Sequence, residues 1–490
     1  MKYIATFDFG TTAVKGALVD AAGKLKAFDS VNLSLDLRSG HVEQDPQDWI
    51  RAFEKISRVF FSVTAAESIA GLIMSGQMQD VILMDDHLWP MGKAILYQDG
   101  RSRKECEALL NVLGEEELER ITGNAYSPTL VLPKLVWVKR NMPELWKKAC
   151  CVLHSPKDVI NALLTGQCCT DTTTASTAGA MDIHRKIWDP SILEAADIPL
   201  SHMPRICAPH ECIGRVTKAA AGQFGYTEGM PIFCGIGDAG ASFFASGLIH
   251  DGEFSITLGT TGMIGLIAME TIPPKNGIWN LAAMVEDTYI HVVPFLNAGN
   301  VHKWVSSLVS SNSENIDYAY MNKLLDEPHG KSGLVCLPFL TGERFPVVDP
   351  DVRGCLIGLT PSTTRADIAN ACLEGVCFSI KQGLNTIGVL PRKVVLIGGG
   401  ARAVQWCQKM ADILEVDITV LSHSDVLPSI TLAGGALRSL GLIDDYTNFV
   451  QQIQKQNGST IYKPQSTLRD YYRRCYQIYL QIYPSVRQLF

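Results

Sequence analysis

The segment Asp8-Phe9-Gly10-Thr11-Thr12-Ala13-Val14-Lys15 decides the fold of this chain. Apolar, β-prone runs at residues 3–7 and 14–19 flank it, which predicts two strands joined by a tight turn. A turn of similar composition, Gly259-Thr260-Thr261-Gly262, stands between the apolar runs 254–258 and 263–267 in the second half of the sequence. The repeated strand–turn–strand unit predicts two domains built on one plan.

Strands and helices alternate along the rest of the chain. Apolar residues at helical spacing follow Pro46 and recur at 404–414, whereas 231–238 and 394–397 have the pattern of buried strands that end in glycine turns. Further helices are expected over 239–247 and over the tyrosine-rich residues 471–483. This alternation predicts an α/β fold. We place the domain boundary near Gly247–Gly252, which gives domains at 1–247 and 248–490.

The composition is that of a globular protein. Of 490 residues, 47% are apolar and 19% are charged, which excludes a disordered or fibrous chain. The net charge of −7 gives no general attraction to nucleic acid or anionic membranes. No apolar run approaches the roughly 18 residues that span a bilayer, and the N-terminus does not read as a signal peptide. We therefore expect a cytoplasmic protein whose 14 cysteines, none spaced Cys-x-x-Cys, are reduced.

Glycine-rich turns follow four of the apolar runs, at Gly10, Gly235–Gly240, Gly259–Gly262 and Gly398–Gly400. Backbone amides in such turns approach phosphate oxygens closely. One such turn is usually structural, but four of them favour nucleotide binding.

The first of these turns carries the sharpest chemistry. Asp8 at a strand end is a candidate ligand for hydrated Mg²⁺, which usually keeps several waters and takes one or two carboxylates. Thr11 and Thr12 have hydroxyls that can donate to phosphate oxygens. Lys15 either supplies positive charge to the site or is a solvated lysine on a hairpin, and the sequence leaves both interpretations open.

Asp238 also allows two interpretations. Within Gly235-x-Gly237-x-x-Gly240 it belongs to a dinucleotide-binding pattern, but the acidic residue expected about 20 positions later is missing, because Asp251 and Glu253 come too early. As a carboxylate at the mouth between two domains, it would instead accept the proton of a hydroxyl that attacks a γ-phosphate.

A series of short motifs extends over almost the whole chain: Asp8–Thr12, Gly40-His41-Val42-Glu43-Gln44-Asp45-Pro46, Ser75-Gly76-Gln77-Met78, Gln98–Arg101, Lys134–Asn141, Pro156-Lys157-Asp158, Asp171, Ala175-Ser176, Gly237-Asp238, Leu258-Gly259-Thr260, Gly342-Glu343-Arg344, Gly354–Leu359 and Gly398–Ala401. In this order the motifs resemble those of the FGGY carbohydrate kinases, within the actin, Hsp70 and hexokinase superfamily. Val131 departs from the family's first signature, which usually has Pro, Ser or Thr there.

The resemblance implies two ribonuclease-H-like domains around a central cleft, with sugar mainly on the N-terminal half and ATP mainly on the C-terminal half. It implies Mg²⁺-dependent transfer of the ATP γ-phosphoryl group to a sugar or polyol hydroxyl, with Asp238 as general base and Asp8 orienting Mg²⁺. The residues expected to bind ATP or its phosphates are Thr11, Thr12, Lys15, Gly259, Thr260, Gly399, Gly400 and Ala401. The residues expected to bind substrate are Met78, Gln79, Asp99, Arg101 and Thr129.

Several alternatives stay open beside this expectation. For Asp99 and Arg101, the alternative to substrate binding is an ion pair or loop anchor. A homodimer is one possible assembly. Outside the family, the chain could be a nicotinamide-dependent oxidoreductase that uses Gly235–Gly240, or a non-catalytic actin-like protein that binds ATP.

The identity of the sugar depends on one departure from the family. Ser75–Met78 and Gly342–Pro346 look most similar to xylulokinases, so a ketose such as D-xylulose is the expected substrate. Xylulokinases usually carry histidine where this chain has Gln79, and the two side chains present different hydrogen-bond patterns. Because buried polar groups reject mismatched substrates strongly, gluconate, glycerol, a tetritol and a deoxyketose are the alternatives.

Overall fold

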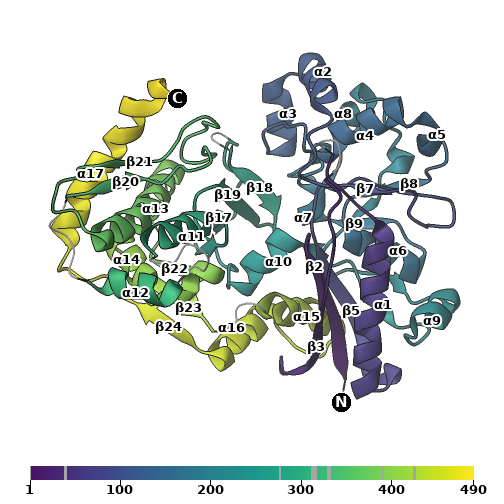
Figure 1. Ribbon diagram of the computed structural model, residues 1–490. Coiled ribbons are helices and arrows are strands. Elements are labelled where there is room, and N and C mark those ends of the chain that lie inside the picture. Colours follow the sequence, from purple (N-terminus) through teal and green to yellow (C-terminus); the bar gives the residue numbers. More distant parts are fainter. Residues whose placement is uncertain are drawn as a thin grey trace.

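Two mixed sheets flanked by helices lie side by side in the computed structural model (Figure 1). The structure describes residues 2–37, 41–274, 277–310, 317–327, 333–388, 391–422 and 426–490, so Gly40 of the second sequence motif lies outside the described residues. The N-terminal sheet and its helices occupy one side of the molecule, and the C-terminal sheet occupies the other.

In the described part of the chain, seven strands form the N-terminal sheet, in the order β13-β14-β5-β1-β2-β3 with β15 paired to β5. The strand β1 pairs antiparallel with β2 and parallel with β5, which confirms the predicted first hairpin. Their bounds are β1 Tyr3–Phe9, β2 Ala13–Asp20, β3 Leu25–Asn32, β5 Ile69–Gly76, β13 Cys212–Arg215, β14 Pro231–Phe233 and β15 Ile236–Gly237.

The C-terminal sheet repeats this plan. Its order among the described residues is β18-β19-β17-β16-β22-β23-β24. From β19 to β24 the neighbours pair antiparallel, antiparallel, parallel, parallel and antiparallel, as they do from β3 to β13 in the first sheet. The predicted α/β fold of two domains on one plan is thereby confirmed. The bounds are β16 Phe254–Leu258, β17 Gly262–Ala268, β18 Trp279–Ala282, β19 Tyr289–Phe295, β22 Lys393–Ile397, β23 Asp417–Leu421 and β24 Ser459–Tyr462.

Amphipathic helices cover the sheets. Asp45 caps the helix predicted after Pro46, which is α1 (Pro46–Val63), and the Phe53 ring lies 4.7 Å from that of Phe7 on β1. The tyrosine-rich tail forms α17 (Arg469–Val486), which buries Tyr472 and Tyr479 in the C-terminal core. Within the described residues, no helix combines the length and apolarity needed to cross a bilayer.

The other α-helices are α2 Arg103–Leu113, α3 Glu115–Thr122, α4 Val131–Asn141, α5 Pro143–Trp146, α6 Pro156–Thr165, α7 Thr172–Ala175, α8 Pro190–Ala195, α9 Lys218–Phe224, α10 Asp238–Ala245, α11 Gly299–Val309, α12 Tyr318–Asp326, α13 Arg365–Ile387, α14 Val404–Leu414, α15 Leu427–Ser439 and α16 Tyr446–Asn457. Short strands outside the two sheets are β4 Glu43–Gln44, β6 Ile82–Met84, β7 Ala94–Ile95, β8 Cys151–Leu153, β9 Cys169–Asp171, β10 Met181–Asp182, β11 Ile187–Trp188, β12 Arg205–Cys207, β20 Val335–Leu337 and β21 Cys355–Ile357.

The helices α10 and α15 pack against each other at the junction of the two halves (Figure 1). Although α15 is late in the sequence, it lies on β1 and β5, where Ala433 and Ala436 share a core cluster with Ile4 and Ile73. The N-terminal sheet is therefore covered partly by C-terminal residues. The domain boundary placed near Gly247–Gly252 stays a prediction.

Candidate active site

The first glycine–threonine turn closes the β1–β2 hairpin. Gly10 N donates to Ala13 O at 3.0 Å. The carbonyl oxygens of Thr11 and Thr12 are anchored by Gln44 Nε2, at 2.7 Å, and by the Leu33 amide, at 2.8 Å. Thr12 is exposed and Thr11 is half-buried. The turn is thus held through its carbonyl groups, with the Thr12 side chain accessible to a ligand.

The second turn is also anchored through its carbonyl groups but is one residue shorter, with three residues between Leu258 and Gly262 against four between Phe9 and Val14. Gly259 N donates to Thr261 O at 2.9 Å, and the amides of Gly299 and Asn300 donate to the carbonyls of Gly259 and Thr260 at 2.9 and 3.0 Å. Thr260 is exposed. Because residues 299 and 300 start α11, this helix fixes the turn from behind.

The third glycine turn lies next to the second, because β22 runs parallel to β16 and both strands end there. Gly398 has φ +91°, and a Cβ on it would lie 2.6 Å from the Leu258 carbonyl oxygen. Gly399 is exposed, and no atom lies within 4 Å of the position that its Cβ would take. Ala401 is buried beneath the turn. The structure therefore brings Gly259, Thr260 and the residues 399–401 to one edge of the C-terminal sheet.

Asp238 is the first residue of α10, one position earlier than the predicted helix. Its Oδ1 accepts a hydrogen bond of 2.7 Å from the Ala239 amide. Burial, followed by the negative charge of Asp8, raises the pKa of Asp238 to about 7. A carboxyl group with this pKa exchanges protons readily near neutral pH, as a general base requires.

The glycines before Asp238 serve close packing inside the protein. A Cβ on Gly235 would lie 1.8 Å from the Met74 carbonyl oxygen, and a Cβ on Gly237 would lie 2.0 Å from the sulfur of Met78. These contacts explain the glycine pattern without a bound dinucleotide. They also place Met78, a predicted substrate residue, directly against the backbone that leads into Asp238.

Asp8 lies near the end of β1, between two polar neighbours set by strand register. Lys15 is its partner on β2 and Ser75 its partner on β5, and Ser75 Oγ donates to Asp8 Oδ1 at 2.8 Å. Burial raises the pKa of Asp8, although Ser75 and the charge of Lys15 both act to lower it. Lys15 is half-buried opposite Asp8, and its contact with phosphate stays a prediction.

The donor set around Asp8 fits a hydrated Mg²⁺ ion. Among the described residues, no group of three or more His, Cys, Asp or Glu side chains could hold a metal. Kinase Mg²⁺ is usually bound by one or two carboxylates together with water and substrate phosphates. Asp8, whose Oδ2 receives no hydrogen bond from the described residues, has an oxygen available for such an ion.

The segment after Met78 forms a polar cluster with α4. Gln79 has φ +66°, an uncommon conformation for a residue other than glycine. The buried Lys134 of α4 donates to its carbonyl oxygen at 2.9 Å and to Leu96 O at 2.8 Å. No hydrogen bond engages the Gln79 carboxamide within the described chain, so this group is available to a ligand.

Asp80 completes the cluster, and its part was missed by the sequence analysis. Its carboxylate accepts from Gln77 Nε2 at 2.8 Å and from the Tyr97 amide at 3.1 Å. Burial raises the pKa of Asp80 well above its ordinary value, against the charge of Lys134, and the charge of Asp238 adds to this rise. Asp80 and the candidate base are therefore electrostatic neighbours. The only sequence signal was an acid directly after two candidate substrate residues.

Asp99 and Arg101 form a buried ion pair. Asp99 accepts from the Arg101 side chain at 2.7 and 2.8 Å and from the Val42 amide at 2.7 Å. The Arg101 guanidinium also donates to Glu43 at 2.8 Å and lies 4.9 Å from the ring centre of Trp137. This arrangement corresponds to the loop anchor, and contact of either residue with substrate stays a prediction.

Thr129, the remaining candidate on the substrate side, lies on the loop before α4. Its hydroxyl is 2.7 Å from Ser127 Oγ, and it is half-buried. Direct contact with substrate stays a prediction here as well.

Comparisons with known proteins agree with this geometry. Residues 3–245 match the N-terminal domain of the FGGY family of carbohydrate kinases, and residues 254–434 match its C-terminal domain. A xylulose kinase of Staphylococcus epidermidis (strain ATCC 12228 / FDA PCI 1200) is 29% identical over 494 residues, covering 98% of this chain and 96% of that protein.

Solved structures have the same fold over the whole chain. The crystal structure of xylulose kinase from Rhodospirillum rubrum has a TM-score of 0.90 at 25% identity and covers 100% of this chain and 99% of its own. That of gluconate kinase from Lactobacillus acidophilus has a TM-score of 0.88 at 24% identity, covering 99% and 98%. The latter likeness shows the fold alone.

Proposed function

Because the chain belongs to the FGGY family of carbohydrate kinases, we propose that it transfers the γ-phosphoryl group of ATP to a hydroxyl of D-xylulose. The xylulose kinase of S. epidermidis, which matches nearly the full length, supports this sugar. The similarity to a gluconate kinase structure shows that the fold does not decide the sugar. Gluconate, glycerol, a tetritol and a deoxyketose are therefore the alternatives within the family.

One observation carries the reaction type: Asp238, with a pKa raised to about 7, stands at the start of α10 beside Asp8. In the proposed mechanism Asp238 accepts the proton of the substrate hydroxyl as the oxygen attacks phosphorus. Such a general base typically contributes roughly 10²–10⁴-fold to the rate. A non-catalytic actin-like protein would not need a carboxylate with this pKa. We therefore favour the kinase over the non-catalytic protein and over the oxidoreductase.

The two hairpin turns and the third glycine turn bind ATP in this proposal. Thr11, Thr12, Gly259 and Thr260 donate to phosphate oxygens, and Lys15 adds positive charge. Gly399 and Gly400 let the adenosine approach the backbone, with Ala401 beneath them. Asp8 would hold Mg²⁺ through water, and the ion when bound offsets the negative charge of the phosphates. Closure of the two halves excludes water and limits hydrolysis of ATP.

Gln79 is the residue proposed to adapt the site to its sugar, with Met78 beside it. Its carboxamide points a donor and an acceptor at the substrate, where a histidine would offer a different pair. Gln79→His tests this role. We expect the variant to change the ratio of kcat/KM between two sugars by at least tenfold, with the ATP KM nearly unchanged. An unchanged ratio would remove Gln79 from sugar selection.

The first experiment measures ADP release with ATP and Mg²⁺ over ketoses, aldoses, polyols and sugar acids. We expect a single strong acceptor, D-xylulose. A stronger rate with gluconate or a polyol would replace the sugar but keep the kinase. ATP binding without ADP release on any acceptor would favour the non-catalytic alternative, and binding of NAD(H) or NADP(H) would favour the oxidoreductase.

We also propose a cytoplasmic location. All 14 cysteines are free thiols, which is the usual state in a reducing compartment. The net charge of −7 supports the proposal that nucleic acid and membranes are not partners. A homodimer is the assembly we propose to test, by light scattering at several protein concentrations.

A further inference from the structure

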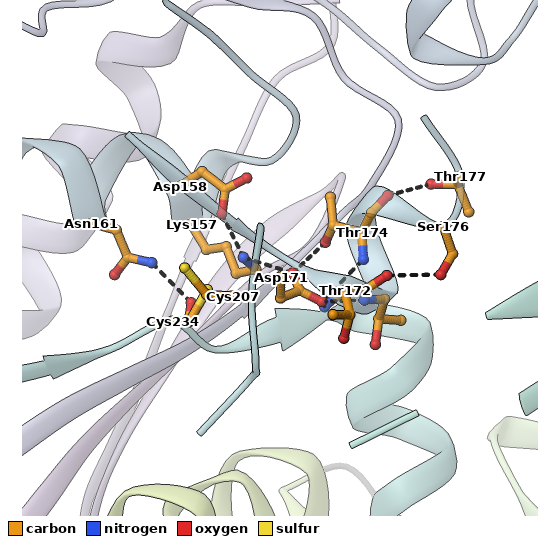
Figure 2. A network of polar contacts seen from close by, with 12 residues as sticks. Lys157, Asp158, Asn161, Asp171, Thr172, Thr174, Ser176, Thr177, Cys207 and Cys234 are labelled. Atoms are coloured by element: carbon orange, nitrogen blue, oxygen red, sulfur yellow. Dashed lines mark hydrogen bonds and ion pairs between the residues drawn. The ribbon is translucent and has the colours of Figure 1, made fainter. Parts of the chain in front are cut away.

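Lys157, Asp158 and Asp171 form a buried network of charges (Figure 2). Lys157 and Asp158 occupy the first turn of α6, and Asp171 ends β9. Lys157 Nζ lies 2.5 Å from Asp158 Oδ1 and 2.9 Å from Asp171 Oδ2, and all three side chains are fully buried. Burying three charges is costly unless they are paired and hydrogen-bonded. Packing alone therefore does not explain why these three charged residues are buried together.

Asp171 reaches from this network to the residue before the base. Its Oδ1 accepts from the amides of Thr173 and Thr174 at 2.9 and 3.0 Å, and also from the Gly237 amide at 3.3 Å. Its Oδ2 accepts from Thr174 Oγ1 at 2.6 Å. One carboxylate thus caps α7 and holds the backbone directly before Asp238.

The helix α7 also touches the other half of the molecule. Thr173 Oγ1 donates to the carbonyl oxygen of Ala282 at 2.5 Å, and the Ala282 amide donates to Ser176 Oγ at 2.9 Å. Ala282 ends β18, the edge strand of the C-terminal sheet. Through Asp171 and α7, the backbone of Gly237 is therefore connected to the half proposed to bind ATP.

Asp189 shows what an ordinary helix cap looks like in the same chain. It caps α8 with hydrogen bonds of 2.9 and 3.1 Å from the amides of Ser191 and Ile192. Among the described residues, Asp189 forms no ion pair with a lysine and no hydrogen bond with residues 235–241. Capping alone therefore requires neither a buried lysine nor the bond to Gly237.

We propose that Asp171, held by Lys157, is a positioning residue that fixes Gly237 and so sets the place of Asp238 relative to the ATP-binding half. The inference rests on the proposed role of Asp238. The Lys157 ammonium group fixes the orientation of the Asp171 carboxylate, and Asp158 pairs the remaining side of the ammonium group. Asp171 touches neither substrate nor ATP in this proposal, so its loss lowers turnover without weakening ligand binding.

The kinetic test compares Asp171→Asn with the matched cap variant Asp189→Asn. Asparagine caps helices nearly as well as aspartate, but at 171 its amide group would face the Lys157 ammonium and must move away. We expect kcat to fall roughly 10–100-fold in Asp171→Asn, because a displacement of about 1 Å has effects of this size. The dissociation constants of ATP and sugar should stay within about threefold. Asp189→Asn should keep the wild-type kcat.

A second pair of variants makes a smaller change to the network, in case Asp171→Asn does not fold. Thr174→Val removes the hydrogen bond to Asp171 Oδ2, whereas Thr174→Ser retains it. We expect Thr174→Val to lose part of kcat and Thr174→Ser to recover it. A loss of kcat that is equal in Asp171→Asn and Asp189→Asn, or a rise in KM with kcat unchanged, would overturn the proposal.

Hydrogen exchange separates this proposal from the proposed function. Deuterium uptake by a peptide that covers residues 235–241 should be at least threefold faster in Asp171→Asn and unchanged in Asp189→Asn. This readout needs no substrate. If the wild-type protein phosphorylates no sugar, the proposed function fails, yet the exchange rates still decide whether Asp171 holds Gly237. Equal exchange in all three proteins would overturn the positioning role.

Discussion

The two hairpins at the carboxyl ends of β1 and β16 share a backbone plan but differ in charge. Asp8 and Lys15 face each other across the first hairpin, and Thr257 and Met263 face each other across the second. The difference separates two tasks. The first hairpin has the charged groups suited to a metal ion and phosphate, whereas the second offers only backbone and hydroxyl donors.

The helices α10 and α15, which follow the equivalent strands β14 and β23, also differ in whether they carry a charged residue at their start. The helix α10 begins with the half-buried Asp238, whereas α15 begins with Leu427, which is fully buried on the N-terminal sheet. The duplicated fold thus keeps its candidate acids in the N-terminal half. The C-terminal half, which we propose binds the anionic nucleotide, has no carboxylate at the equivalent positions.

The largest expected effect on turnover comes from replacing the candidate base, Asp238, in the N-terminal half. Asp238→Asn keeps the shape of the side chain but cannot accept the proton. We expect kcat to fall by roughly 10²–10⁴-fold, with ATP binding retained in a titration followed by calorimetry. Turnover close to that of the wild-type protein would exclude Asp238 as the base.

The charge difference between the hairpins predicts a second effect. Asp8→Asn should raise the Mg²⁺ concentration for half-maximal rate by roughly tenfold or more, since metal sites respond strongly to loss of an anionic group. The matched control is Thr257→Val at the equivalent position, where the hydroxyl is buried and has no hydrogen-bond partner among the described residues. We expect this variant to keep its Mg²⁺ requirement within about twofold. Equal shifts in both variants would contradict the division of tasks.

The pH dependence sharpens the comparison further. Asp238 must be deprotonated to act, so kcat/KM should rise with pH through an apparent pKa of about 7. The negative charge of Asp8 raises this pKa, so Asp8→Asn should move the acid limb to lower pH, by up to about one unit. Initial rates between pH 5 and 9 at saturating Mg²⁺ measure the shift. A limb that moves to higher pH would mean that another group titrates.

The sequence predicted the elements of the site better than their connections. The hairpin around Gly10 and the start of α10 could be predicted because glycine turns and apolar periodicity are local signals. The cluster of Asp80 with Lys134 could not, because these residues lie far apart in the sequence and only the packing of α4 brings them together. The link from Asp171 to Gly237 was missed for the same reason.

The packing of α15 was equally beyond local patterns. No local pattern indicated which sheet residues 427–439 would cover, and the structure places them on the sheet of the other half. The ion pair of Asp99 and Arg101 shows a further limit. The sequence left both a substrate contact and an anchor open. The contacts with Val42, Glu43 and Trp137 show an anchor, and a contact with substrate stays a prediction.

A substitution in the third glycine turn should destabilise the protein through its backbone conformation. Gly398 lies at φ +91°, a conformation that residues with a Cβ rarely adopt. We expect Gly398→Ala to lower the free energy of unfolding by about 1–3 kcal/mol. Urea unfolding followed by tryptophan fluorescence measures this change, and a stable variant would show that the turn relaxes.

The smallest expected effect is the loss of stability when the first glycine of either hairpin turn, Gly10 or Gly259, is replaced by alanine. A Cβ on Gly10 would lie 3.2 Å from the Ala13 carbonyl oxygen, and one on Gly259 would lie 3.2 Å from that of Thr261. A small shift of the backbone can relieve either contact. Each alanine variant should therefore lower the free energy of unfolding by less than about 1 kcal/mol. The two costs should differ by less than about 1 kcal/mol, because the contact would be 3.2 Å in both turns although the first turn is one residue longer. A larger difference in the same urea experiment would mean that the extra residue of the first turn changes its backbone strain, and the contrast between the hairpins could no longer be assigned to side chains alone.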